Sequence, residues 1–144
     1  MGKGEKDILA KWETQKGGAA VEFAIVLPIL VLLVSGIIEF SLALYDKAVI
    51  TNASREGARA GIVSQDPRVD DASIKGVVKR YCSNYLVTFG AHTAVTDGDI
   101  SITRDASGVD LTVTVMYPYT FLVLPKLMTI GPINLAAATL MRME

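Results

Sequence analysis

One long apolar stretch decides the architecture of this 144-residue chain. Residues 17–45 read GGAAVEFAIVLPILVLLVSGIIEFSLALY, and no charged residue lies between Glu22 and Glu39. A helix over the uncharged residues 23–38 is about 24 Å long, and the flanking residues extend it beyond the hydrocarbon core of about 30 Å. The stretch therefore predicts a transmembrane helix over residues 18–45. The alternative, a helix buried in a protein core, has no obvious partner in so short a chain.

The residues before this stretch indicate how it is oriented in a membrane. Residues 1–17 form a polar leader with four lysines, whereas only Lys47 closely follows the apolar stretch. Basic residues favour the cytoplasmic side, so we expect a cytoplasmic amino terminus and a single pass, with the carboxyl-terminal domain on the other side. Small residues at 17–20 precede the apolar run, whereas in a secretory signal they follow it. Cleavage at these small residues would remove the leader and leave the helix on the mature protein.

The composition excludes several classes of function. Lys and Arg number 14 and Asp and Glu 15, so the chain lacks the basic surface that nucleic-acid binding needs. One cysteine, Cys82, and one histidine, His92, cannot form a zinc site or a Cys/His nucleophile pair. No phosphate-binding loop, dinucleotide fingerprint or nucleophile elbow occurs in the sequence. We therefore expect no catalytic residue, metal, cofactor, small-molecule substrate or nucleic-acid partner, with Cys82 a buried, inert thiol and His92 an exposed loop residue.

Helical spacing continues past the apolar stretch and predicts an amphipathic extension over residues 46–63. A row of small residues recurs there at every fourth position: Ala53, Gly57 and Gly61. Another backbone can approach closely along such a row, so it would pack either on the chain's own domain or on a neighbouring subunit. Charged residues of the same stretch, a further part of the possible docking surface, are Arg55, Glu56 and Arg59. The last two are spaced for a local ion pair worth about 0.2–0.5 kcal/mol.

Residues 64–144 are expected to form a small α+β domain. Apolar side chains at helical spacing predict a helix over about 67–86, with Asp66 as its cap. Alternating apolar and polar residues predict strands near 100–102 and 109–117, joined by a turn at 105–108, and a third strand over about 133–143 is expected to pair after the connection at 118–132. The predicted fold is thus a long amino-terminal helix, then one helix packed on a roughly three-stranded antiparallel sheet. An apolar cluster at 121–128 would pack under this domain or offer a patch to the membrane or a partner.

The small residues before the helix belong to a recognisable motif. Gly17 is followed five residues later by Glu22, then by Phe23 and the apolar helix. This pattern resembles the processing site of type IV pilin-like proteins. More specifically, the chain resembles the TadE-like family, minor pilins or pseudopilins of the tight-adherence (Flp-type) pilus. The matching pieces are AVEFA at 20–24, Leu27-Pro28, IEF at 38–40, NASREGAR at 52–59 and ATLMR at 138–142.

The resemblance implies a processed subunit of a pilus assembly. A membrane aspartic prepilin peptidase would cut between Gly17 and Gly18. The positive amine created at Gly18 would then pair with Glu22 of a neighbouring subunit as helices bundle, with Phe23 on the same assembly helix. The alternative for Glu22 is a carboxylate that is simply solvated near the lipid headgroups.

Two further residues of the span carry expectations. Pro28 lacks an amide proton and should kink or loosen the helix near Ala24. Glu39 stands at the far end of the span, where it would be either a solvated boundary residue or an assembly contact. The expected partners are membrane lipid, the prepilin peptidase, and other pilin-like and tight-adherence assembly subunits. The expected location is the bacterial inner membrane, with a periplasmic domain.

A different class of function stays open on the sequence alone. A single-pass anchor could carry a periplasmic binding module that is not processed as a pilin. A membrane-tethered enzyme would need a convergent polar pocket, which the sequence does not indicate. The mass of the mature amino terminus separates the first two classes, because a processed pilin begins at Gly18.

Overall fold

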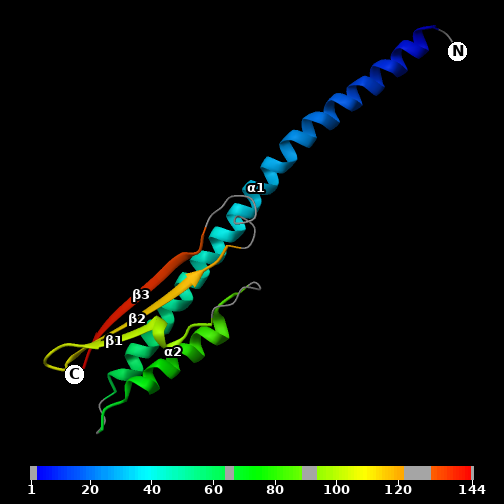
Figure 1. The fold of residues 1–144 in the computed structure, drawn as a ribbon. Helices are drawn as coiled ribbons and strands as arrows, with labels where there is room; N and C mark the ends of the chain where they lie inside the picture. The colour runs from blue at the N-terminus through cyan, green and yellow to red at the C-terminus, as the bar shows by residue number, and fades with distance from the viewer. Residues whose placement is uncertain (1–2, 64–66, 89–93, 122–130, 144) are drawn as a thin grey trace. The chain divides into compact units, whose positions relative to one another are not determined.

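A computed structural model describes residues 3–63, 67–88, 94–121 and 131–143, with side chains from residue 17 onward. The chain divides into two compact units, Met1–Ile38 and Glu39–Glu144. The first helix, α1, spans Lys3–Gly61 and contributes to both units (Figure 1).

The first unit is the amino-terminal part of α1. In the described part of the chain, α1 is the one helix long and apolar enough to cross a membrane. No side chain between residues 17 and 38 is buried, and Phe23 and Ile29 remain 62% and 63% exposed. A core helix would be covered by other elements, so this exposure argues for the predicted membrane helix against the buried alternative. α1 continues through Pro28, so the proline does not end the helix.

A three-stranded antiparallel sheet forms the second unit together with the rest of α1 and a second helix. β1, Ile100–Arg104, pairs with β2, Asp110–Tyr119, which in turn pairs with β3, Ile133–Arg142. The register places Val113 between Ile102 and Thr139. The predicted α+β fold is confirmed.

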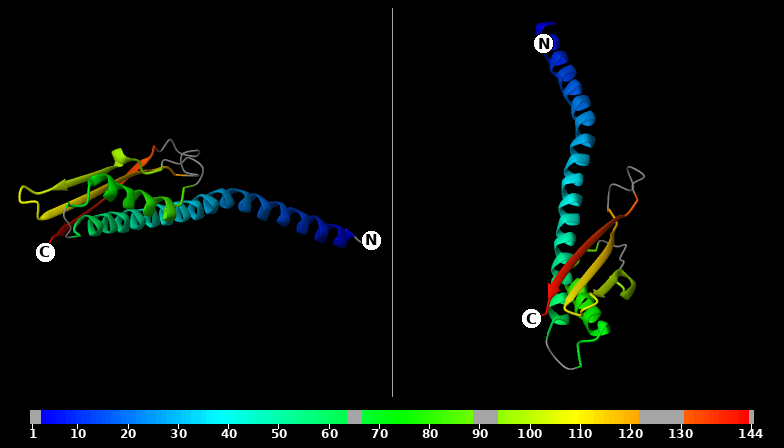
Figure 2. Two further views of the ribbon diagram at one scale, coloured as in Figure 1. Left: turned by 90° about the horizontal axis from the view of Figure 1, so that it is seen from below. Right: turned by 90° about the vertical axis from the view of Figure 1, so that its left-hand side faces the viewer.

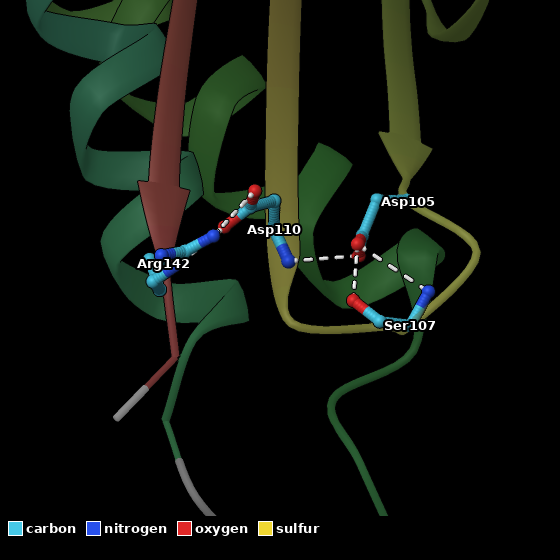
Figure 3. A network of polar contacts seen from close by, with 4 residues as sticks. All are labelled: Asp105, Ser107, Asp110 and Arg142. Carbon is cyan, nitrogen blue, oxygen red and sulfur yellow. Dashed lines mark hydrogen bonds and ion pairs between the residues drawn. The ribbon is translucent and has the colours of Figure 1, made fainter.

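The turn between β1 and β2 is organised by Asp105 (Figure 3). Its Oδ1 accepts the amide hydrogen of Asp110 at 2.9 Å, and its Oδ2 accepts the hydroxyl and, at 3.3 Å, the amide of Ser107. These hydrogen bonds, that of the Ser107 hydroxyl foremost, lower the pKa of the Asp105 carboxyl to about 2. Gly108 completes the turn with a φ of 69°, which glycine adopts without strain. At the same end of the sheet, Arg142 Nε donates to Asp110 Oδ1 at 2.8 Å and ties β3 to β2.

The second helix, α2, spans Asp71–Tyr85 and begins later than predicted. The predicted cap, Asp66, lies outside the described residues, and the helix starts after Asp70, whose backbone is extended. Arg68 Nη1 donates to the carbonyl of Gly108 at 3.0 Å, which holds the residues before α2 against the β1–β2 turn. Pro67, which favours a helix start, therefore lies before α2, in a segment that is held by a contact with a distant turn.

Both helices cover the same face of the sheet (Figure 2). The covered face of β2 carries Leu111, Val113 and Val115, all fully buried. They form one core with apolar side chains of α1 and α2, among them Ile50 and Val78. The segment predicted as a separate extension, 46–63, is therefore an integral part of a domain that begins at residue 39.

Polar contacts also join α1 to the edge strand β3. Ser54 Oγ and Thr139 Oγ1 lie 2.7 Å apart, and the Lys47 ammonium donates to the carbonyl of Ala136. β3 is an edge strand of the described sheet, and Lys47 contacts one of its backbone carbonyls. α1 is thus attached to the sheet by polar as well as apolar contacts.

At its small-residue row, α1 lies close against other elements of the domain. Ala53 and Gly57 are buried, as is Gly61. A Cβ atom built on Gly57 would lie 2.5 Å from Val78 Cγ2, and one built on Gly61 would lie 2.7 Å from Ile74 Cδ1. Of the two alternatives for this row, the structure shows packing on the chain's own domain.

We predict that Gly57→Ala destabilises the protein. The added methyl has no room beside Val78, and overpacking of this kind costs about 1–3 kcal/mol, more than the gain in helix propensity of about 1 kcal/mol. Gly76→Ala in α2 is the matched control, because a Cβ there meets nothing within 4 Å. Thermal unfolding of the full chain in detergent, followed by near-ultraviolet circular dichroism, should show a lower Tm for the first variant and an equal or higher Tm for the control. Equal Tm values for both variants would contradict the close approach.

Candidate processing and assembly sites on the long helix

The predicted processing site lies on an open part of α1. Gly17 and Gly18 are exposed, and a Cβ added to either would meet nothing within 4 Å. Among the described residues, nothing packs against this peptide bond. A peptidase could therefore reach it without first displacing another part of the described chain.

Glu22 and Phe23 follow one turn later and are exposed as well. No ion pair to Glu22 is formed within the described part of the chain, and Phe23 is 62% exposed. A carboxylate beside an uncharged membrane helix is expensive without a partner. The geometry leaves both side chains available to lipid, to headgroups or to another helix.

Glu39 is buried, although one of its two predicted roles was that of a solvated residue at the boundary of the span. Its side chain is 2% exposed, because the compact domain starts at this residue and covers it. The Tyr119 hydroxyl, at the carboxyl end of β2, donates to the Glu39 carbonyl at 3.3 Å. The interpretation as a solvated boundary residue is therefore wrong, and the interpretation as an assembly contact remains a prediction.

Asp46 is a buried acid that the sequence analysis did not identify. It lies seven residues after Glu39 on the same side of α1 and is fully buried. The amide of Val87 donates to its Oδ1 at 3.0 Å, whereas its Oδ2 has no hydrogen-bond partner among the described residues. Burial raises the pKa of the Asp46 carboxyl, although the Val87 hydrogen bond opposes this change. A signal was present in the sequence, since Ala43 and Ile50 flank Asp46 at helical spacing on an otherwise apolar face.

The raised pKa of Asp46 predicts a pH dependence of stability. The folded state holds the proton more tightly than the unfolded state, whose pKa is near 3.8. The stabilising contribution is therefore fully present below the unfolded value and is lost as pH rises through the raised folded value. In Asp46→Asn, Oδ1 still accepts from Val87 and no charge forms, so unfolding in detergent should give a Tm that falls less between pH 4 and 8 than in the natural chain. Parallel Tm profiles for the two proteins would contradict a buried, proton-linked carboxyl.

The predicted docking residues separate into two groups. Ala53, Gly57 and Gly61 face the domain core, whereas the charged residues lie at the surface. Arg55 is exposed, and Arg59 Nη2 lies 3.1 Å from Glu56 Oε1 in the expected ion pair. Any contact with a neighbouring subunit through this stretch falls to the charged group.

Glu56 also lines a surface cavity that the sequence did not indicate. The cavity measures about 250 Å³ and lies between α1 and α2. Tyr81 and Tyr85 line its α2 side, with ring centroids 4.7 Å apart. The surface face of α1 is thus continuous with a shallow aromatic groove.

A larger cavity, of about 440 Å³, includes the single cysteine. Cys82 is 1% exposed, and burial raises the pKa of its thiol to about 11, so the prediction of a buried, inert thiol is confirmed. Lys79, also in the lining, lies 2.6 Å from Asp97 in an ion pair. Neither side chain is arranged as a nucleophile, so the cavity lends no support to a tethered enzyme.

Other expectations lie partly or wholly outside the described residues. His92 and the cluster residues 122–128 are among these. Phe121, where the cluster starts, is partly buried and packs edge-on against Tyr119, with ring centroids 5.4 Å apart. Within the described ranges, no three His, Cys, Asp or Glu side chains gather as metal ligands.

Comparison with known proteins bears on the long helix. The chain matches none of the curated proteins and none of the solved structures with which it was compared. Residues 17–59, from the candidate cleavage site to the last charged residue of the docking stretch, match the family model described as TadE-like protein. This match confirms over residues 17–59 the TadE-like resemblance drawn from the sequence, and it places the TadE-like segment on α1.

Proposed function

We propose that this protein is a minor pilin or pseudopilin of the tight-adherence pilus, processed by a prepilin peptidase and assembled through lateral packing of α1. The observation that carries the proposal is the TadE-like match over residues 17–59. The match begins at the candidate cleavage site and includes the apolar part of α1 whose side chains are exposed. In this account the protein is a peptidase substrate and a structural subunit of the bacterial inner membrane. Its amino terminus is cytoplasmic and its domain periplasmic.

The length of the bare helix supports membrane anchoring. The compact domain begins at Glu39, so residues 18–38 are the part of α1 that lies before it and after the leader. At 1.5 Å per residue these residues extend about 32 Å, close to the hydrocarbon thickness of about 30 Å. The bare segment is therefore as long as a single pass requires.

Processing would change the charge at the start of this segment. Hydrolysis of the Gly17–Gly18 peptide bond releases the lysine-bearing leader and leaves a positive amine on Gly18. Glu22 lies one helical turn further on. A carboxylate drawn to the bilayer centre costs about 2.5–3.5 kcal/mol, so an amine from a neighbouring subunit would stabilise it in a bundle of helices.

The middle of the bare segment also favours neighbours. Pro28 leaves the carbonyl of Ala24 without its helical donor, and within a membrane such a group needs a partner from another helix or from local adjustment. The exposed side chains on both sides, Phe23 among them, are free to pack on other pilin-like subunits. The proposed partners are therefore lipid, the peptidase and further subunits of the assembly.

We predict that Gly17→Leu blocks processing. The peptidase would no longer find a small residue at the cleavage position, so intact-mass measurement of protein purified from membranes should show the leader retained. Gly36→Leu is the matched control, because it makes the same change on the same helix, and a Cβ at either position meets nothing within 4 Å. The natural chain and the control should both begin at Gly18.

An intact leader in the natural chain would overturn the pilin proposal and favour a membrane-anchored binding module. Cleavage beyond Leu44 would favour a secreted domain, since the apolar helix would be lost. A start at Gly18 in the Gly17→Leu variant would refute the requirement for a small residue.

We predict that Glu22→Ala inserts normally into the membrane but recovers fewer partner subunits. Glu22→Gln should behave in the same way, whereas Glu22→Asp should restore part of the recovery because it keeps the charge. Membrane fractionation checks insertion, and affinity purification with quantitative mass spectrometry of co-purified subunits measures assembly. Unchanged recovery with Glu22→Ala would remove the charge-pairing mechanism.

A further inference from the structure

The domain carries a second lipid contact beyond the membrane helix. We infer that the end of the domain formed by residues 40–45 of α1 and the neighbouring ends of β2 and β3 rests in the interfacial layer of the bilayer. This inference rests on the proposed anchoring of α1 and adds a lipid-facing surface on the domain itself.

The first turns of α1 inside the domain are apolar on two sides. Ala43 faces the core and is 6% exposed, together with the buried Asp46. On the other side, Phe40, Leu44 and Tyr45 remain 64%, 54% and 46% exposed. Phe40 and Leu44 lie at i and i+4, one above the other on the helix surface, and Tyr45 lies about 100° further round from Leu44. The domain therefore leaves an apolar face of α1 uncovered directly after the membrane segment.

The end of β2 and the start of β3 lie beside the start of this helical stretch. Tyr119, the last residue of β2, is tied to the Glu39 carbonyl by its hydroxyl at 3.3 Å and pairs in register with Ile133, the first residue of β3. Ile133 is 38% exposed. Because Glu39 directly follows Ile38 of the uncharged run, this end of the sheet lies beside the residue at which the chain enters the domain.

The described residues 40–45 of α1 include no charged side chain. The charged residues between positions 39 and 54 are Glu39, Asp46 and Lys47. The two acids are buried, and the Lys47 ammonium is bound to the carbonyl of Ala136 in β3. The side of α1 that carries Phe40 and Tyr45 therefore presents no charge to its surroundings over this stretch.

The opposite end of the sheet is charged. Asp105, Asp110 and Arg142 gather at the β1–β2 turn (Figure 3), and the Arg104–Asp71 ion pair adds two more charges. β2 has ten residues, so the two ends lie about 30 Å apart. The domain thus has one end suited to lipid and one suited to water.

Continuity with the apolar run identifies lipid as the occupant of this surface. The exposed apolar side chains of residues 40–45 follow the uncharged residues 23–38 with no exposed charge between them. Residue 45 lies about 9 Å from Glu39 along the helix axis. The interfacial region of a bilayer adds about 5–7 Å on each side of the hydrocarbon core, and aromatic side chains such as Tyr45 concentrate there. The exposed apolar face therefore ends close to where the interfacial layer ends.

Tryptophan quenching in vesicles tests the contact. The full chain contains one tryptophan, so Trp12→Phe gives a silent background for single probes. Tyr45→Trp and Ile133→Trp report on the proposed surface, Ser107→Trp on the charged end, and Leu30→Trp on the membrane helix. Each variant is placed in phosphatidylcholine vesicles at a high lipid-to-protein ratio, with bromine carried either near the headgroup end or near the tail end of the acyl chains.

The expected result is a loss of emission for Tyr45→Trp and Ile133→Trp with the shallow bromine. Leu30→Trp should respond most to the deep bromine, and Ser107→Trp should keep its emission with both. Leu44→Trp serves as a second probe of the same helix face if Tyr45→Trp fails to fold by near-ultraviolet circular dichroism.

Other results would overturn the inference. Quenching of Leu30→Trp without quenching at positions 45 and 133 would leave the anchor intact and reject the domain contact. Quenching at 45 but not at 133 would show that the helix protrudes and the sheet stands clear of lipid, which also rejects it. An unquenched Leu30→Trp would reject the anchoring itself, and a response at 45 that depends on protein density instead of bromine would assign the face to a neighbouring subunit.

Discussion

The close approach of α1 to α2 and to β2 is the contact on which the domain depends. At Gly57 and Gly61 the helix backbone comes so near to Val78, Ile74 and Leu111 that no side chain fits between them. This proximity lets a three-stranded sheet and one short helix bury a continuous core against a helix that otherwise lacks partners. Without this close approach, apolar side chains of α1, α2 and the sheet would be exposed to water, and the domain would lose part of its core.

α1 has one part that the domain leaves uncovered and one part that belongs to the domain, and the placement of charged residues marks the boundary between them. Residues 23–38 carry no charge and are covered by no other described part of the chain. From Glu39 onward charged residues occur again, yet Glu39 and Asp46 are buried in the domain and Lys47 contacts the backbone of β3. Burying Asp46 raises the free energy of the folded state, because one of its oxygens has no hydrogen-bond partner among the described residues. The raised pKa of Asp46 is the measurable sign of that cost.

Much of the fold follows from local patterns in the sequence. Alternation of apolar and polar residues located β1 and β2, and Asp105 with Gly108 located the turn, because both depend on neighbours in the chain. The start of α2 could not be found in this way, since the contact between Arg68 and Gly108 joins residues forty positions apart. The burial of Glu39 has the same origin, because the residues that cover it come from the far end of β2.

For the candidate sites, the sequence was informative where a motif fixes the spacing, as at Gly17 and Glu22. It left the row at Ala53, Gly57 and Gly61 open, because the same four-residue spacing suits any backbone that approaches the helix, whether of the same chain or of another. The choice depends on Ile74 and Leu111, which approach from other elements.

The hydrogen bond from Lys47 to Ala136 has a consequence for proteins crowded in one membrane. β3 is ten residues long, uncharged up to Arg142, and pairs along one side only, a combination that invites fusion of sheets between copies. Lys47 reaches β3 from α1, so a strand of a second copy that paired with β3 beside Ala136 would have to displace this contact. The contact that attaches α1 to the edge strand therefore also disfavours joining of β3 to another sheet.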